Sequence, residues 1–160
     1  MKVEGRTSNV ERRKSKGERA IIGVVISVTA LLAAPVPFIS IAKGFVSDQE
    51  TARQAVVRTP AAWQALWNDH APGDKLPTLD FVTNMVVGVF LGTKPTAGYG
   101  VEIVGMKTDG DTLVVEFTER QPGRGTMAAQ ILTQPFHMVS VPRHEGTVRF
   151  VAVTSIGDRR

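Results

Sequence analysis

The side chains best suited to acid–base or metal chemistry in this 160-residue chain are its three histidines, His70, His137 and His144. Metal sites combine histidine with Cys, Asp or Glu at short, characteristic spacings. None of the three histidines has a second ligand-type residue at such a spacing, and the chain contains no cysteine. The sequence therefore predicts no metal site, no disulfide and no cysteine nucleophile.

Serine nucleophiles and phosphate-binding loops need sequence frames that the chain lacks. No serine stands in a G-x-S-x-G frame, and Ser140 falls in the middle of an expected strand. The glycines from Gly88 to Gly100 fit neither the phosphate-loop spacing nor the dinucleotide-binding spacing. Asp109 and Asp111 flank a turn glycine and supply far fewer oxygens than a calcium ion takes. We therefore expect a protein that is not an enzyme, without catalytic residues and without a cofactor.

The distribution of charge argues against nucleic-acid binding. The net charge of the chain is +4, and Met1–Arg19 accounts for all of it with seven bases and three acids. From Ala20 onward, twelve bases face twelve acids, and these charges are scattered singly. Proteins that bind phosphate backbones gather their bases on one surface. We expect a neutral main domain that binds no nucleic acid.

The basic N-terminal segment is followed by an apolar one, which is the pattern of a secretory leader. Ala20–Ala42 carries no charge, and Pro35 and Pro37 near its end would break a helix. The positive flank of such a leader stays in the cytoplasm while the rest of the chain emerges on the far side. The pattern predicts export.

The same residues are compatible with a leader that is cleaved and with one that is kept as a membrane anchor. Ser40-Ile41-Ala42 places small residues before a cut ahead of Lys43, and a second possible cut lies after Ala33 or Ala34. Twenty-three uncharged residues are also long enough to span a bilayer as an uncut anchor. A cut after Ala42 predicts a periplasmic or secreted protein. An uncut leader predicts a domain held outside the cytoplasm by the inner membrane, which the chain then contacts only through this segment.

The remainder of the chain is expected to hold one domain. Residues 1–42 are assigned to the leader, 43–52 to a polar linker, 53–156 to the domain and 157–160 to a tail. Thr59-Pro60 predicts a helix start, with threonine as the cap. Trp63, Leu66 and Trp67 follow at helical spacing, which favours a core position over a pair of tryptophans that stacks on a ligand.

Short apolar or alternating segments predict that this domain is mainly β. Val82–Leu91 is apolar on both faces from Met85, which indicates a central strand covered on both sides. Thr108-Asp109-Gly110-Asp111 predicts a hairpin turn between two strands, Tyr99–Lys107 and Thr112–Thr118. Further strands are expected at 53–58, at 128–141 with a break near Pro135, and at 147–154. We expect an α+β fold: an antiparallel sheet folded as a sandwich or a partly open barrel, with one short packed helix.

The turns between these strands should alternate between the two ends of the sheet. Residues 93–98 and 121–125 would then share one end, with residues 109–110 and 143–146 at the other. Loops on a rigid scaffold commonly carry binding residues. The candidate partner-binding residues lie on the glycine-rich loops of the first end: Lys94, Pro95, Thr96, Gly98, Tyr99, Arg120 and Arg124.

The segment from Thr59 to Phe150 resembles the C-terminal domain of the PrcB-type protease-complex subunits. Its most specific block is V-V-G-V-F-L-G-T-K-P-T-A-G-Y at 86–99, with Val141-Pro142-Arg143 following in family order. The resemblance implies an exported, non-catalytic accessory or stabilising subunit of a secreted or surface protease complex, with a protease or envelope protein as its partner. Some members look like lipoproteins, whereas this chain has no cysteine to carry the lipid.

A second resemblance gives the alternative function. The stretch K-P-T-A-G-Y at 94–99 looks like the proline-threonine-glycine-aromatic loop of chagasin-type cysteine protease inhibitors. Those inhibitors insert several loops from one end of a β-sandwich into a protease cleft. Their arginine-proline-aromatic loop is missing from this chain. Direct protease inhibition through the end loops is therefore the second hypothesis.

Overall fold

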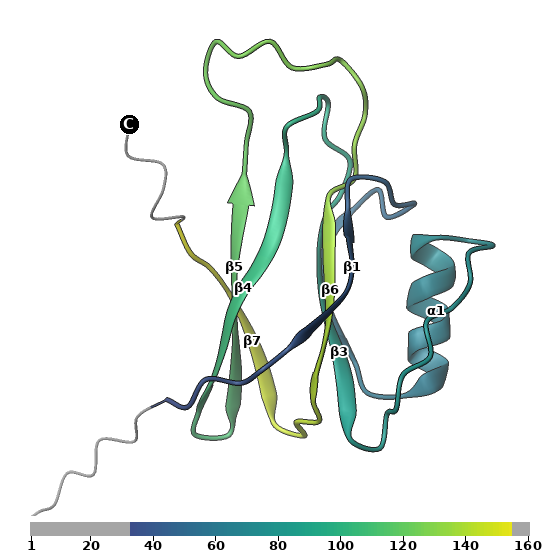
Figure 1. The fold of residues 1–160 in the computed structure, drawn as a ribbon, viewed down its shortest axis with the longest axis vertical. Helices are drawn as coiled ribbons and strands as arrows, with labels where there is room; N and C mark the ends of the chain where they lie inside the picture. The colour runs from purple at the N-terminus through teal and green to yellow at the C-terminus, as the bar shows by residue number, and fades with distance from the viewer. Residues whose placement is uncertain (1–32, 155–160) are drawn as a thin grey trace, which may run out of the picture. The chain divides into compact units, whose positions relative to one another are not determined.

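Two β-sheets stacked face to face, with one helix on the outer face of the larger sheet, make up the fold (Figure 1). The computed structural model describes residues 33–154, so the expected leader up to residue 32 and the tail at 157–160 lie outside the described residues. The four-stranded sheet has the order β1-β6-β3-β2 and the three-stranded sheet the order β4-β5-β7. The elements are β1 (Ile39–Gly44), β2 (Ala52–Val57), α1 (Pro60–His70), β3 (Asn84–Leu91), β4 (Gly100–Asp109), β5 (Thr112–Arg120), β6 (Phe136–Pro142) and β7 (Thr147–Ala152).

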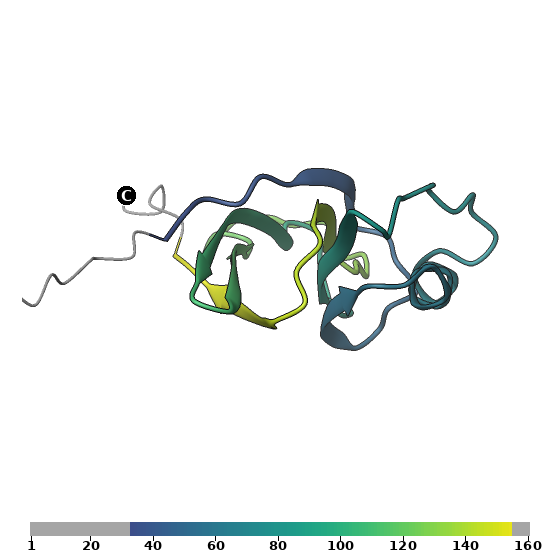
Figure 2. The ribbon, with the colours of Figure 1, turned by 90° about the horizontal axis from the view of Figure 1, so that it is seen from below.

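This arrangement confirms the expected fold class and selects the sandwich over the barrel. Seen along the strands, the two sheets and α1 form three successive layers (Figure 2). No helix within residues 33–154 has the length and apolar character needed to cross a membrane.

Helix α1 begins where the sequence predicts. The Thr59 side chain accepts a hydrogen bond from the Ala62 N–H at 3.2 Å, and Pro60 occupies the first turn. Trp63 and Trp67 are buried against the four-stranded sheet, and their indole N–H groups donate to backbone carbonyls of the loop that follows α1. Because both rings pack in the core, the expected core role of the two tryptophans is confirmed.

Strand β3 lies at the centre of the fold and is buried from Met85 to Leu91. Its residues alternate between the two cores of the domain. Val87 and Val89 face the three-stranded sheet, whereas Val86 and Phe90 face α1. A strand covered on both faces must be apolar on both faces, which explains the uninterrupted apolar run in the sequence.

One strand pairing departs from the expected antiparallel pattern. Strands β5 and β7 run parallel, from Thr112↔Thr147 to Phe117↔Ala152. The strand between them in sequence, β6, lies in the other sheet, so the chain reverses twice before it returns to pair with β5. The turns still alternate between the two ends, as predicted. A Cβ atom on Gly98 would lie 3.1 Å from Pro122 at one end, and His144 contacts the Asp111 carbonyl at the other.

Residues 34–44, here named the N-terminal strap, cross from one sheet to the other. At their start, the Val36 N–H donates to the Met106 carbonyl on β4 at 2.9 Å, and the Thr108 N–H donates to the Ala34 carbonyl. At their end, β1 pairs antiparallel with β6. Val36 and Phe38 pack against the core between the sheets. The strap therefore closes one side of the sandwich.

The strap bears on two boundaries expected from the sequence. The leader was expected to end at Ala42, but a cut ahead of Lys43 falls inside β1. Residues 43–52 were expected to be a linker, but Gly44 ends β1, Ser47 and Gln49 are buried, and Ala52 begins β2. An apolar edge strand and the end of an apolar leader have the same composition, so the sequence could not separate them.

We predict that a chain beginning at Lys43 is less stable than one beginning at Ala34. The shorter chain loses Val36 and Phe38 from the core and residues 39–42 of β1, which should lower the free energy of unfolding by about 3 kcal/mol. Urea denaturation of both chains measures the difference. Equal unfolding midpoints and slopes would show that the strap is not part of the stable fold.

Candidate partner-binding site

The loop at 92–99 is fastened along its length to residues 129–133. The backbone groups of Lys94 and Thr133 exchange two hydrogen bonds, at 2.7 and 3.0 Å, and the Ala97 N–H donates to the Ala129 carbonyl. The Lys94 ammonium lies 5.8 Å from the centre of the Tyr99 ring, within cation–π range. The predicted residues Lys94, Pro95, Thr96, Gly98 and Tyr99 are thus held in one fixed loop.

Glycine is required where this loop leaves β3. Gly92 has a φ of +66°, and a Cβ atom there would lie 2.6 Å from the backbone nitrogen of Ala52 and from the carbonyl oxygen of Glu50. No side chain fits at that distance, and the positive φ itself favours glycine. The close approach lets the Thr93 N–H donate to the Glu50 carbonyl, which ties the loop to the chain ahead of β2.

Arg120 and Arg124 lie on a separate groove beside this loop. The groove encloses about 1280 Å³ between the end of β1, the start of β4 and residues 118–124. The Lys43 ammonium bridges to the Glu102 carboxylate at 2.8 Å on its wall. Within residues 33–154, neither arginine forms an ion pair. The structure therefore brings the candidate residues to one end of the sandwich but divides them between a fixed loop and a groove.

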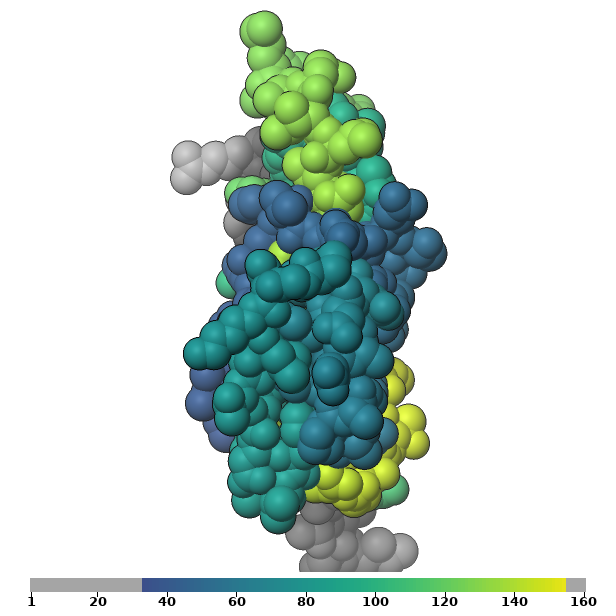
Figure 3. Space-filling view, turned by 90° about the vertical axis from the view of Figure 1, so that its right-hand side faces the viewer, coloured from purple at the N-terminus to yellow at the C-terminus, as the bar shows by residue number. Residues whose placement is uncertain are grey.

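The same end of the sandwich carries a cluster of exposed apolar side chains that the sequence did not predict. Of eight large apolar side chains exposed in the described part of the chain, five lie here and are named the apolar rim: Phe45, Val46, Met127, Ile131 and Leu132. The Gln134 N–H donates to the Phe45 carbonyl at 2.8 Å, which joins the two segments that form the rim. In Figure 3, residues near 130 lie directly above those near 45.

The sequence did not predict the rim because its residues were assigned to other elements. Phe45 and Val46 fell in the expected linker, and Ile131 and Leu132 fell in the strand expected at 128–141. In the structure, residues 128–135 form no strand apart from the bridge at Thr133. In a sequence, two adjacent apolar residues of a loop cannot be distinguished from two residues of a buried strand.

His137 and Ser40 form a contact that resembles part of a catalytic dyad, with Ser40 Oγ 3.0 Å from His137 Nε2. The other ring nitrogen, Nδ1, accepts a hydrogen bond from the Ile103 N–H at 2.9 Å. A neutral ring that accepts at Nδ1 carries its proton on Nε2, so Nε2 donates to Ser40. A serine nucleophile needs the opposite arrangement, with a lone pair on the nitrogen that faces the hydroxyl. The contact therefore links strands and does not activate the serine.

Both buried histidines are held neutral. Burial lowers the pKa of His137 below its ordinary value of 6.5; the charge of Lys43 adds to this effect and that of Glu102 opposes it. Burial also lowers the pKa of His70, against the opposing charges of Asp48 and Asp74. No group of three or more His, Asp or Glu side chains within residues 33–154 is placed to hold a metal ion.

The two buried histidines have the same structural task. His70 Nδ1 lies 2.7 Å from the Ser47 hydroxyl, and His137 holds Ser40. Both serines belong to the segment from Ser40 to Ser47, which leads from the strap to the apolar rim. This segment is therefore fastened to the core by two neutral imidazoles.

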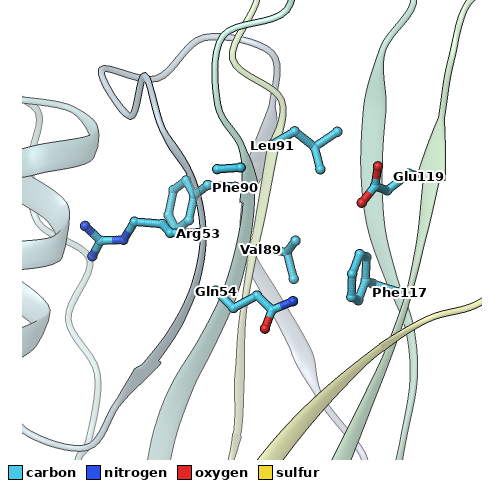
Figure 4. A pocket seen from close by; sticks show the side chains of 8 residues that line it. Arg53, Gln54, Val89, Phe90, Leu91, Phe117 and Glu119 are labelled. Atoms are coloured by element: carbon cyan, nitrogen blue, oxygen red, sulfur yellow. The ribbon is translucent and has the colours of Figure 1, made fainter.

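A smaller cavity opens on the side of the sandwich that the strap leaves uncovered (Figure 4). It encloses about 330 Å³ between the apolar side chains Val89, Leu91 and Phe117, with Gln54 and Glu119 also on its wall. It lies where β7 stops, since β7 pairs with β5 only as far as Phe117. Its lining offers no cluster of reactive groups.

We predict that the free energy of unfolding falls as the pH is lowered from 7.5 to 5. Below pH 6.5 the unfolded chain binds protons that the folded chain excludes from His70 and His137, so stability is lost as the pH falls. Each histidine contributes at most about 1.4 kcal/mol per pH unit. The lowered pKa values of Asp80 and Glu102 affect stability only near and below their ordinary values of 3.8 and 4.5.

Urea denaturation across this pH range measures the slope. His137→Asn keeps an acceptor near Ile103 but removes one titrating group, and should flatten the slope. His144→Asn, which changes a histidine outside the core, is the matched control. A stability that does not change between pH 7.5 and 5 would contradict the neutral, buried state of both rings.

Comparison with known proteins gives one match. Residues 85–142, from β3 to the end of β6, match the family model described as PrcB C-terminal. No curated protein and no solved structure matches the chain. The matched residues include the loop at 92–99, the groove residues at 118–124 and three residues of the apolar rim, so the candidate site lies largely within the family's domain. Over these residues the match confirms the resemblance to the PrcB C-terminal domain that the sequence predicts.

Proposed function

We propose that this domain is a non-catalytic protein-binding module that acts outside the cytoplasm as an accessory or stabilising subunit of a protease complex. The observation that carries the proposal is the apolar rim. Met127 is fully exposed, and Val46 and Leu132 are 83% and 69% exposed. Large apolar side chains gathered at one end of a soluble domain are typical of a surface that a protein partner covers.

The rim is suited to binding because it is held in place. The hydrogen bonds between residues 129–133 and the loop at 92–99, and from Gln134 to Phe45, fix the backbone around Ile131, Leu132 and Phe45 before a partner arrives. A preorganised surface loses less conformational freedom on association, so more of the contact energy appears as affinity. The family match is compatible with a partner in a protease complex.

Export is the second part of the proposal. The basic segment at 1–19 and the uncharged run at 20–42 support it, as the pattern of a secretory leader. The strap limits the positions at which the leader could be cut without removing part of the fold. Cleavage after Ala33 or Ala34 would keep Val36 and Phe38 in the domain, as would an uncut anchor.

Site-specific photocrosslinking in the cell that makes the protein tests the proposal. A photoreactive amino acid is placed at Ile131 on the rim, and in a matched variant at Val82, which is exposed on the turn before β3 at the opposite end. We expect a crosslinked protease or envelope protein from position 131 and none from position 82. Crosslinks to the same proteins from both positions, or to none from position 131, would contradict a partner at the rim.

The protease recovered in this way separates a subunit from an inhibitor. An accessory subunit should leave its activity unchanged or raise it when the purified protein is added in excess. Loss of activity in proportion to the added protein would favour the inhibitor hypothesis instead.

A further inference from the structure

We infer that the groove between β1 and β4 binds an extended acidic segment of the protein partner, which adds to the free edge of β4 as a further strand. This inference rests on the proposed function and goes beyond it by naming the binding mode and the chemistry of the partner. Strand addition needs backbone groups without partners, room for a chain beside them, and side chains that select the segment.

The free backbone groups are those of Val101. The Ile103 N–H points away from β5, because it donates to the ring of His137. Backbone groups alternate along a strand, so the N–H and C=O of Val101 point to the same side as those of Ile103. Val101 lines the groove, and within residues 33–154 β4 has no strand neighbour on that side.

The remainder of this edge is already occupied. Met106 and Thr108 bond to the strap, and the Ile103 N–H is taken by His137. Sheet edges left open in this way invite pairing with another chain, and natural proteins usually cover them. Here the strap and the His137 ring cover the edge from Ile103 to Thr108 and leave Gly100–Glu102, beside the groove, uncovered. The open stretch is therefore limited to the part of β4 nearest the apolar rim.

The groove has room for a backbone. Gly44 and Gly100 line it with backbone alone. A Cβ atom on Gly100 would meet only ordinary contacts, with Arg120 and Phe45 at 3.7 Å or more, whereas one on Gly44 would lie 3.2 Å from the Phe136 ring. Glycine within strands often marks a close approach of another backbone. The volume of about 1280 Å³ exceeds the roughly 300–1,000 Å³ of small-molecule pockets. The half-exposed ring of Phe45 supplies an apolar wall that continues into the rim.

The charges of the groove favour an acidic segment. Its walls carry three bases, Lys43, Arg120 and Arg124, against two acids, Glu102 and Glu119. Lys43 and Glu102 neutralise each other, so the two arginines exceed Glu119 by one positive charge. The loops at 92–99 and 121–134 beside the groove add Lys94 and no acid. Guanidinium groups bind carboxylates in a directional, bidentate manner.

Titration of the full chain, kept soluble in mild detergent, with two synthetic octapeptides tests the inference. One alternates aspartate with valine and the other lysine with valine. In amide NMR spectra we expect the aspartate peptide to shift Val101 and Glu102 and to slow hydrogen exchange at Val101, as an added strand would. The lysine peptide should bind at least tenfold more weakly.

Variants in which arginines are replaced by glutamate test the role of charge in the groove. Arg120→Glu with Arg124→Glu should weaken binding of the aspartate peptide at least tenfold, while Arg149→Glu, an exposed arginine on β7, should leave it unchanged. Equal affinity for both peptides, or shifts that spare Val101, would overturn the inference. If either of these results is found while Ile131 still crosslinks to a partner, the groove inference is wrong and the proposed function is retained. Absence of that crosslink would count against the proposed function alone.

Discussion

The hydrogen bond from the Ile103 N–H to the ring of His137 is a buried polar contact that joins the two sheets beside the apolar core they share. His137 lies on β6 in the four-stranded sheet, Ile103 lies on β4 in the three-stranded sheet, and the same ring donates to Ser40 on β1. A single buried imidazole thus joins three strands that are far apart in sequence. Because a protonated ring cannot accept at Nδ1, the contact exists only while the histidine is neutral.

This contact also determines which part of the molecule is open. Beyond Ile103, the strap covers β4 at Met106 and Thr108, and the sandwich is closed on that side. Before Ile103, no strand of the described part of the chain pairs with this edge of β4, and the groove begins. The apolar rim lies at this open end, as do Arg120 and Arg124, which form no ion pair with the residues that the structure describes. The candidate binding surface is therefore a consequence of how far the strap and His137 extend along one strand.

Features set by neighbouring residues could be predicted from the sequence. The cap at Thr59, the hairpin at Asp109-Gly110 and the doubly covered strand β3 each depend on a short stretch of chain. The alternation of the turns followed from strand geometry, and it placed the candidate loops at one end. The block at 86–99 gave the family resemblance that the match at 85–142 confirms.

Features set by distant residues could not be predicted. Ser40 and His137 are 97 positions apart, and nothing near His137 in sequence indicates a polar partner. The strap could not be predicted for a related reason, since Ser40 and Ala42 become part of a strand only through their pairing with β6. With most of β1 assigned to a leader, Phe45 and Val46 fell in a linker, and these two of the five rim residues were not predicted to form a surface.

Amide hydrogen exchange at two positions of β4 tests the central claim most directly. The Ile103 N–H is bonded to His137 and the Val101 N–H faces the open groove, although both side chains are buried. We expect the Ile103 amide at neutral pH to exchange about 100-fold more slowly than the Val101 amide. Equal protection of the two amides would contradict both the histidine contact and the open edge of β4.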